Sequence, residues 1–527
     1  PGTPTDSPLV TASANGIGGG GFFVYYDARS GRIRTIDGRE TAPARMRADS
    51  FVENGQPIPF ADAVTSGLSV GVPGTPATWA LALDRWGSID LRQALRPAAR
   101  LANQGFVVDE TFRQQTEANA ERFAAFPSTR ELFLPGGGPP AVGSVLRNRD
   151  LARTYTQLGT RGTDYLYRGQ LGEDIVATVK QPPVDPSSTR LVRPGLMRQP
   201  DLDGYRAVLR APTRVNYRGL TVAGMAPPSS GGSTVGEALN ILEGTDMASL
   251  DRSEALHRYL EATALAFADR NRYVGDPAFV DVPLNELLSQ GFADERACLI
   301  GPTAAPKPVL PGSPDGSYAS CPAAGAGADR GVDQGRSTTH LTTWDRWGNV
   351  VSYTLTIEQT GGSGIVVPNR GFLLNNELTD FNFTPTQGAG APDPNLPAPG
   401  KRPRSSMSPT IVLDDGEPVL AIGSPGGSMI ITTVAQTLVN RLDFGMPLLD
   451  AVAAPRSSQR NTAAVSAEPA FITTWGPALT ARGHVFVSVA EIGAVTAIER
   501  GKNGRLVAVA EPVRRGGGDA GVVQPRR

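Results

Sequence analysis

The sequence predicts an α+β protein in which stacked β-sheets are covered by layers of helices. Helical apolar periodicity dominates the first half of the chain, and strand patterns rich in β-branched and aromatic residues follow from about residue 338. With 527 residues and 40% hydrophobic content, the chain can build one large domain or two or three ordinary ones.

The predicted elements of the first half begin with a hairpin of Phe22–Tyr26 and Arg32–Arg39. Helices are expected over 78–103, 109–126, 148–158, 171–179 and about 237–242, with a long one from about Ser253. A strand over 217–225 leads into a stiff Pro-Pro-Ser-Ser-Gly-Gly loop. Gly16–Gly21 formally matches the dinucleotide pattern G-x-G-x-x-G, but a strand follows it instead of a helix, so we do not interpret it as a nucleotide site.

In the second half, strands are expected over 371–374, 410–413 and 419–422, a helix over 428–442, and further strands after Ala463. Residues 301–335 are rich in Pro, Gly and Ala without periodicity, which is typical of an exposed or mobile connector.

Composition disfavours several classes of partner. Lys plus Arg (50) nearly balances Asp plus Glu (51) without charged runs, so nothing indicates a nucleic acid or a charged membrane surface. No apolar stretch approaches the roughly 20 residues that cross a bilayer. Small molecules are therefore the expected partners. The two cysteines, Cys298 and Cys321, can form a disulfide, and two free thiols are equally compatible with the sequence.

The stretch Ser337-Thr338 is predicted to be a cleavage junction. Thr338–Trp344 and Val350–Ile357 form a hairpin whose register sets Thr338 opposite Thr356, with Glu358 on the same face. Cleavage before Thr338 would make it an N-terminal nucleophile. The alternative is an ordinary Thr-rich strand.

The small number of histidines argues against two kinds of active site, a metal site and a Ser-His-Asp triad. The three histidines, His257, His340 and His484, are far apart in the sequence without metal-ligand spacing, and there is no G-x-S-x-G elbow. We therefore expect no metal and no Ser-His-Asp triad, and interpret His340 as structural. The α-amine of an N-terminal Thr, with a pKa of about 7.7 to 8, supplies a base without histidine.

Further polar groups can complete a site. Glu377 and Asp380 can converge on a cation, Ser405 and Ser406 offer adjacent hydroxyls, and Gly426-Gly427 opens a helix whose N–H groups suit an oxyanion. Ordinary solvated loops and turns are the alternatives, as is a surface ion pair for Arg39 at its strand end.

Eight stretches in order resemble the γ-glutamyltransferase (glutathione hydrolase) family of N-terminal nucleophile hydrolases, from about Gly16 to Val509. They are GIGGGGF, IDGRETAP, VGVPGTPATW, PPSSGG, TTHLTTWDRWGNVVSYTLT, LLNNELTDF, GKRPRSSMSPT and GSPGGS. The resemblance implies a four-layer αββα fold made as one precursor. Self-cleavage would give a large chain, 1–337, with a mobile connector over 301–337, and a small catalytic chain, 338–527, which together form a heterodimer.

The resemblance also implies roles for individual residues. Thr338 matches the nucleophile and Thr356 the residue that hydrogen-bonds it, while Gly426 and Gly427 match the oxyanion hole. Residues matching those that hold the α-carboxylate of a γ-glutamyl group are Arg39, Ser405 and Ser406, and those matching the α-amine site are Glu358, Glu377 and Asp380. No cofactor is implied.

The chain also departs from the family pattern. Some relatives have Asn and Gln at the positions of Glu358 and Glu377, and segment 383–399, where some carry a lid with a Tyr, contains no Tyr here. Only 15 residues precede the Gly motif, so we expect the N-terminal part to be truncated.

The expected activity is hydrolysis or transfer of γ-glutamyl groups from glutathione-like amides to water, amines or peptides. The rivals are a cephalosporin or glutaryl acylase of the same fold and a catalytically silent binding protein. Family habit implies a periplasmic or extracellular location.

Overall fold

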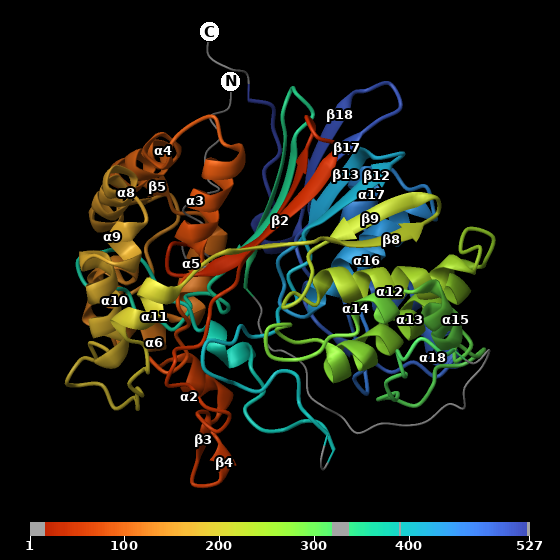
Figure 1. Ribbon diagram of the computed structural model, residues 1–527, viewed down its shortest axis with the longest axis horizontal. Coiled ribbons are helices and arrows are strands. Elements are labelled where there is room, and N and C mark those ends of the chain that lie inside the picture. Colours follow the sequence, from red (N-terminus) through yellow and green to blue (C-terminus); the bar gives the residue numbers. More distant parts are fainter. Residues whose placement is uncertain (1–15, 319–336, 389–390, 524–527) are drawn as a thin grey trace.

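The computed structural model describes residues 16–318, 337–388 and 391–523. Two β-sheets lie face to face between two groups of helices (Figure 1), which confirms the predicted αββα layers. In hydrogen-bonded order, the five-stranded sheet comprises β10 (Thr339–Trp344), β11 (Val350–Thr356), β1 (Gly20–Asp27), β2 (Arg32–Gly38) and β7 (Val208–Arg210). The six-stranded sheet comprises β18 (Leu506–Ala510), β17 (Thr496–Arg500), β13 (Glu417–Gly423), β12 (Thr410–Asp414), β9 (Leu220–Gly224) and β8 (Thr213–Tyr217).

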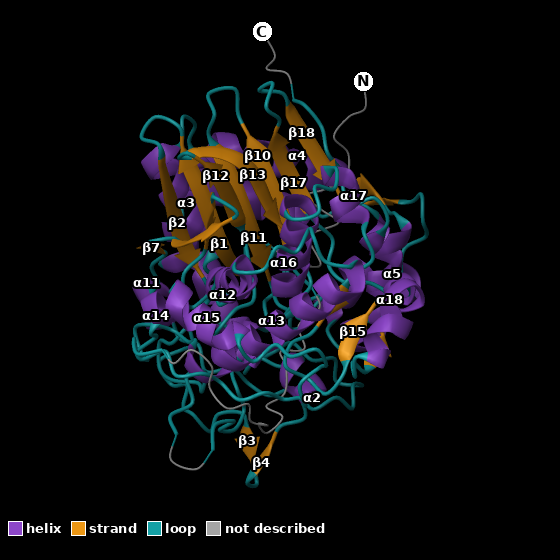
Figure 2. Ribbon diagram, turned by 90° about the vertical axis from the view of Figure 1, so that its right-hand side faces the viewer, coloured by secondary structure: helices purple, strands orange, loops and turns teal. Residues whose placement is uncertain are grey.

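Side chains from both sheets form the central core. Phe22, Val24 and Tyr26 alternate along β1 and belong to the same buried cluster as Ile411 and Leu420. The other face of β1 carries Phe23, whose ring stacks 6.3 Å from Trp86 of α3. Figure 2 shows strands of both sheets overlapping in the upper half of the view.

One helical layer precedes residue 205 and encloses a second core with residues 357–374. Its helices are α3 (Thr75–Trp86), α4 (Leu91–Gln104), α5 (Glu110–Ala118), α6 (Ala120–Ala124), α7 (Pro127–Phe133), α8 (Arg149–Arg161), α9 (Asp164–Tyr167), α10 (Gln170–Lys180) and α11 (Gln199–Gly204). The other layer packs on the six-stranded sheet. It comprises α12 (Gly231–Glu243), α13 (Arg252–Tyr273), α14 (Leu284–Leu287), α15 (Gln290–Ala297), α16 (Met429–Leu442), α17 (Leu448–Ala453) and α18 (Pro469–Ala481).

Smaller elements connect or extend these layers. They are α2 (Phe60–Val64), the 3₁₀ turns η2 (Pro135–Gly137), η3 (Glu377–Asp380) and η4 (Arg514–Gly516), and the short strands β3 (Val52–Glu53), β4 (Gln56–Pro57), β5 (Phe106–Val107), β6 (Val145–Leu146), β14 (Ser457–Ser458), β15 (Val465–Ala467) and β16 (Phe486–Ser488).

Most predicted elements are confirmed, and four differ. The helices expected over 78–103 and 109–126 are each divided in two, because cap residues interrupt the apolar pattern; Asp90 forms a capping box with Gln93 at the start of α4. The strand expected over 217–225 is shorter, because its first residues form the turn of the hairpin β8–β9; this turn uses the left-handed backbone of Arg218 and Gly219, and β9 begins at Leu220.

The strand expected over 371–374 is reduced to one bridge between Val366 and Leu373. Gly371 has a φ of +73°, and the apolar side chains that follow it pack into the core of the first helical layer. Packing of a loop, and not strand pairing, explains this apolar run.

The Gly motif at the start of the described chain serves close packing of strands. A Cβ at Gly19 would lie 2.0 Å from the carbonyl oxygen of Thr356, and one at Gly20 would lie 2.4 Å from that of Gly38. The glycines therefore let β1 lie tightly between its neighbours, which accounts for the motif without a nucleotide.

Both sheets contain strands from each side of the Ser337-Thr338 junction. β1 pairs with β11 over seven residue pairs, from Gly20 with Thr356 to Tyr26 with Val350, and β9 pairs with β12 over four. The two halves of the chain are therefore interleaved in both sheets.

The first part of the predicted connector is bound to the body of the protein. Lys307 pairs with buried Glu261 at 2.8 Å, and the N–H of Gly312 donates to Asp269 at 2.5 Å. The sequence pattern did not reveal these buried partners on α13; the mobility of the connector stays a prediction. Residues 319–336 lie outside the described part.

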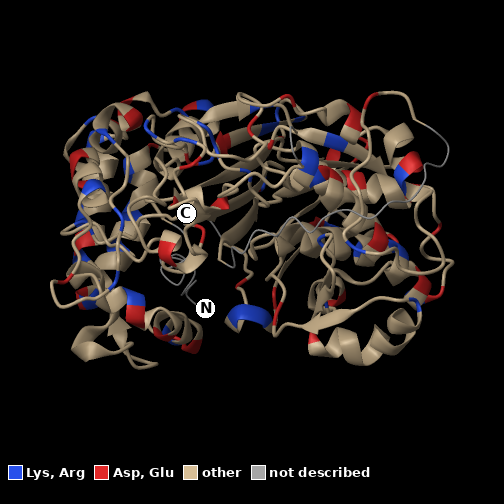
Figure 3. Cartoon of the chain, turned by 90° about the horizontal axis from the view of Figure 1, so that it is seen from below, with Lys and Arg blue, Asp and Glu red and all other residues tan. Residues whose placement is uncertain are grey.

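Charge is distributed evenly over the molecule. Lys and Arg are interspersed with Asp and Glu along the chain (Figure 3), in keeping with the balanced composition. Among the described residues, no helix is both long enough and apolar enough to span a membrane.

Candidate active site

The predicted hairpin brings two threonine hydroxyls together. β10 and β11 pair from Thr339 opposite Leu355 to Trp344 opposite Val350, which confirms the expected register. The Oγ1 atoms of Thr338 and Thr356 are 3.2 Å apart. Thr356 Oγ1 also accepts a hydrogen bond from the N–H of Glu358 at 2.8 Å, so this hydroxyl is fixed beside Thr338.

The Ser337-Thr338 peptide lies against the turn that opens α16. The N–H of Gly426 donates to the carbonyl oxygen of Ser337 at 3.3 Å. Thr338 has a φ of +109°, an unfavourable backbone conformation for a β-branched residue. The Ser337-Thr338 peptide bond thus precedes a residue with an unfavourable backbone conformation, and a backbone N–H donates to its carbonyl oxygen.

The pocket next to Thr338 has about 250 Å³ of empty space, part of it open to solvent. Its lining is Thr338, Thr356, Glu358, Glu377, Asp380, Ser405, Ser406, Met407, Gly427 and Ile430. The fold therefore gathers all the residues predicted for catalysis and substrate binding except Arg39 and Gly426, which lie behind this lining. Met407 and Ile430 are apolar additions that the sequence analysis did not select.

Arg39 lies fully buried between two of the predicted carboxylates. Its guanidinium pairs with both Glu377 and Asp380, and it donates at 3.1 Å to each of the carbonyl oxygens of Pro403 and Arg404. The alternative prediction, that Arg39 forms an ion pair at the surface, is wrong because no part of Arg39 is exposed. Burial alone would lower its pKa, but the nearby carboxylates outweigh burial and raise it, so the guanidinium stays charged.

Glu40 lies beside this ion pair, and neither of its carboxylate oxygens has a hydrogen-bond partner among the residues that the structure describes. Its nearest cation is Arg39, at 3.9 Å. Burial, followed by the charge of Glu377, raises the pKa of Glu40 well above its usual value, so we treat it as neutral.

Glu358 is held in the pocket by its neighbours. It has a φ of +77° just beyond the end of β11, and its carboxylate accepts hydrogen bonds from the side-chain amides of Asn376 and, at 3.2 Å, Gln359. Asn376 was part of a quoted motif, but its role as the partner of Glu358 was not predicted.

The Ser405-Ser406 turn is fixed by the Pro-Pro-Ser-Ser-Gly-Gly loop. Ser230 donates to the carbonyl oxygen of Ser405 from its N–H at 2.7 Å and from its hydroxyl at 2.6 Å. Ser229 donates to the carbonyl oxygen of Met407 at 2.6 Å. The sequence identified this loop as stiff but missed these contacts, because they join segments about 175 residues apart.

His340 packs inside the sheet region, as predicted. Its Nδ1 lies 2.8 Å from Thr354 Oγ1, and a Cβ at Gly423 would lie 2.2 Å from its ring. Burial lowers the pKa of His340 to about 3, so the ring is neutral in the folded protein near neutral pH.

The depressed pKa of His340 predicts that acid destabilises the fold. An unfolded histidine has a pKa of about 6.5, so between there and about pH 3 the unfolded state binds more protons. The free energy of unfolding should therefore fall as pH drops through this range. Melting temperatures at a series of pH values test this: His340→Gln should reduce the slope, and Thr343→Ala, on the exposed face of the same strand, should not. An unchanged slope in His340→Gln would contradict the prediction.

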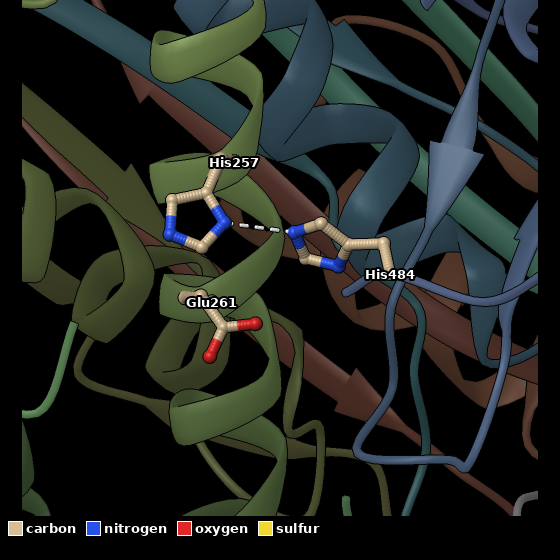
Figure 4. Close-up of side chains that lie close together, drawn as sticks. All are labelled: His257, Glu261 and His484. Atoms are coloured by element: carbon tan, nitrogen blue, oxygen red, sulfur yellow. Dashed lines mark hydrogen bonds between the residues drawn. The ribbon is translucent and has the colours of Figure 1, made fainter. Parts of the chain in front are cut away.

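The other two histidines, far apart in the sequence, meet in the fold. Nδ1 of His257 lies 2.8 Å from Nε2 of His484, and Glu261 lies one helical turn along α13 (Figure 4). These groups have the donor types of a metal site, which sequence spacing did not indicate. Nε2 of His257, however, is 2.8 Å from the carbonyl oxygen of Gly301, and both Glu261 oxygens accept from Lys307. An ammonium thus already balances the carboxylate.

Cys298, at the end of α15, is disulfide-bonded. Its predicted partner, Cys321, lies outside the described residues, so the pairing stays a prediction.

Comparison with known proteins agrees with this geometry. A model of the gamma-glutamyltranspeptidase family matches residues 7–521. The glutathione hydrolase proenzyme of Bacillus subtilis (strain 168) is 38% identical over 512 residues, covering 95% of this chain and 83% of that protein.

Among solved structures, a cephalosporin acylase from Bacillus halodurans has a TM-score of 0.84 at 28% identity, covering 98% of this chain and 89% of that one. A chain of γ-glutamyltranspeptidase from Helicobacter pylori has a TM-score of 0.50 at 32% identity, covering 54% of this chain and 79% of that one. On these matches, the chain belongs to the γ-glutamyltranspeptidase family.

Proposed function

We propose that this enzyme hydrolyses and transfers γ-glutamyl groups of glutathione-like amides, with Thr338 as the nucleophile. The observation that carries the proposal is the ion pair of Arg39 with Glu377 and Asp380 at the pocket. An α-amino acid group needs a cation for its carboxylate and carboxylates for its ammonium, and this arrangement supplies both. A γ-glutamyl substrate can replace these two ion pairs: its α-carboxylate would pair with Arg39, and its α-ammonium with Glu377 and Asp380.

The proenzyme would first cut itself. Thr338 Oγ1 attacks the carbonyl carbon of Ser337, the Gly426 N–H stabilises the oxyanion, and the C–N bond breaks to give an ester at Thr338 with a free amine. Water then hydrolyses the ester and leaves Ser337 with a carboxylate. The strained backbone at Thr338 favours this step, because cleavage releases the constraint.

In catalysis, Thr338 Oγ1 attacks the γ-carbonyl of the substrate while its own α-amine accepts the proton. The amides of Gly426 and Gly427 stabilise the oxyanion, and Thr356 orients the nucleophile. The amine returns the proton to the leaving group, and water or an amine acceptor then releases the γ-glutamyl group. No cofactor is required in this scheme.

The same ion pair argues against a glutaryl acylase as the main activity. A glutaryl group carries a carboxylate but no ammonium. It would draw Arg39 away from Glu377 and Asp380 and leave both carboxylates without a replacement partner, a costly state in a buried site. Glu358 adds a further negative charge to the same pocket.

Hydrolysis of γ-glutamyl and glutaryl p-nitroanilides tests this assignment. We expect kcat/KM to favour the γ-glutamyl compound by roughly 100-fold, and Asp380→Asn to reduce that preference by about 10- to 100-fold through loss of one charged hydrogen bond. Asp62→Asn, an exposed substitution on α2, serves as the control. Equal rates on both anilides in the unmodified enzyme would refute the assignment.

The proposal extends to assembly and location. We expect the chains 1–337 and 338–527 to stay associated after cleavage, because each sheet takes strands from both. Family habit and the disulfide-bonded Cys298 support a periplasmic or extracellular location, where disulfides persist.

A further inference from the structure

Arg270, on α13, lies behind the serine turn of the pocket and is almost fully buried. Its Nε donates to Ser230 Oγ and its Nη2 to Ser406 Oγ, both at 2.8 Å. These two nitrogens form one edge of the guanidinium, so a single planar group bridges two hydroxyls. Arg270 does not line the pocket, whereas Ser406 does.

The direction of these hydrogen bonds has a chemical consequence. A guanidinium only donates, so the oxygen of Ser406 is the acceptor, and the hydroxyl proton of Ser406 must point away from Arg270. The hydroxyl of Ser230 likewise accepts from Arg270 and donates to the carbonyl oxygen of Ser405 at 2.6 Å. Arg270 thus orients one pocket hydroxyl directly and the neighbouring backbone through Ser230.

The positive charge of Arg270 adds to this orientation. A cation behind an accepting hydroxyl polarises its O–H bond and strengthens its donation to an anion. On its other side, Nη1 of Arg270 donates to Asn271 Oδ1 at 2.8 Å, and the guanidinium carbon lies 5.3 Å from the centroid of the Phe267 ring. Arg404 also reaches this region, donating to the carbonyl oxygen of Arg270 at 3.4 Å.

We infer that Arg270 is a positioning residue that aims the hydroxyl of Ser406 at the α-carboxylate of the substrate. This inference depends on the proposed γ-glutamyl function and extends it, because it makes selection for the α-carboxylate depend on a residue outside the pocket. Lysine cannot replace it fully, since an ammonium lacks the planar edge that spans both serines.

Paired substrates give the test. γ-Glutamyl-p-nitroanilide carries the α-carboxylate, and 4-aminobutyryl-p-nitroanilide is the same compound without it. Arg270→Met should raise KM for the first by roughly 10- to 100-fold, the value of a lost charged hydrogen bond, and change KM for the second by less than about 3-fold. Arg270→Lys, which is less disruptive to folding, should also raise KM for γ-glutamyl-p-nitroanilide selectively, by about a third of that factor or less.

Controls separate positioning from general damage. Ser406→Ala should likewise raise KM for γ-glutamyl-p-nitroanilide and change KM for 4-aminobutyryl-p-nitroanilide little. Adding Arg270→Met to Ser406→Ala should change these KM values little further, because both substitutions act on one interaction. Arg272→Met, two residues along α13 at a more exposed site, should leave both KM values unchanged. Cleavage into two chains and the melting temperature report whether each variant folds.

Two results would overturn the inference: equal losses on both substrates in the Arg270 variants, or full additivity with Ser406→Ala. Failure of the proposed function is distinguishable, because it would already be seen in the unmodified enzyme as no preference for the γ-glutamyl compound over the glutaryl one.

Discussion

Thr338→Ala is expected to leave the protein as one uncut chain of 527 residues and to abolish turnover. The substitution removes the hydroxyl that is proposed to attack both the Ser337 carbonyl and the substrate. Loss of a covalent nucleophile lowers kcat by at least about 10⁴-fold in comparable enzymes. Denaturing electrophoresis should show one band for the variant and two bands, 1–337 and 338–527, for the unmodified protein.

Neighbouring substitutions show whether the effect is specific to this hydroxyl. The Thr338→Ser protein keeps the hydroxyl and should still cleave itself. The Thr339→Ala protein, changed at the first residue of β10, should both cleave itself and turn over substrate. Two bands in purified Thr338→Ala, or turnover by an uncut unmodified chain, would exclude Thr338 as the nucleophile.

Arg39→Met is expected to have the second largest effect, because it acts on both stability and binding. Removing one partner of a buried ion pair leaves uncompensated charge and typically costs about 3 to 5 kcal/mol. Here the carboxylates of Glu377 and Asp380 would lose their guanidinium partner. Urea denaturation, read as the shift of the unfolding midpoint, measures the loss of stability.

A second substitution distinguishes charge from packing. Glu377→Gln added to Arg39→Met should recover part of the lost stability but none of the γ-glutamyl activity, since the site for the α-carboxylate is still missing. Arg45→Met, at an exposed position nearby, should change neither quantity. An unchanged midpoint in Arg39→Met would mean that the buried ion pair contributes nothing to the fold.

Local patterns determined much of this protein. The turn Asp345–Asn349 between two β-branched runs fixed the hairpin and its register, and that register placed Thr338 beside Thr356. Helices such as α8, α13 and α16 appear where the apolar spacing predicts them, because each buries one face against its neighbours. Helix ends were less predictable: the caps that divide α3 from α4 outweigh a continuous apolar pattern.

The family resemblance identified most of the candidate site residues, but it did not indicate most of the contacts that they make with one another. It matched Arg39 and Glu377 to opposite ends of a substrate, whereas in the fold they bind one another. It assigned no role to Asn376 or Arg270, whose partners Glu358 and Ser406 are 18 and 136 residues away. The two histidines of Figure 4 are 227 residues apart and were missed for the same reason.

The sequence by itself therefore determined the hairpin that follows Ser337-Thr338, its register and the chemical types of the candidate site residues, because hairpin register and turn chemistry act over a few residues. Only the tertiary structure decided that Arg39 is buried between two carboxylates, that the Gly426 N–H reaches the Ser337 carbonyl and that Arg270 donates to Ser406. Those contacts form when two sheets and two helical layers pack together, and the free energy of burial that selects them depends on segments hundreds of residues apart.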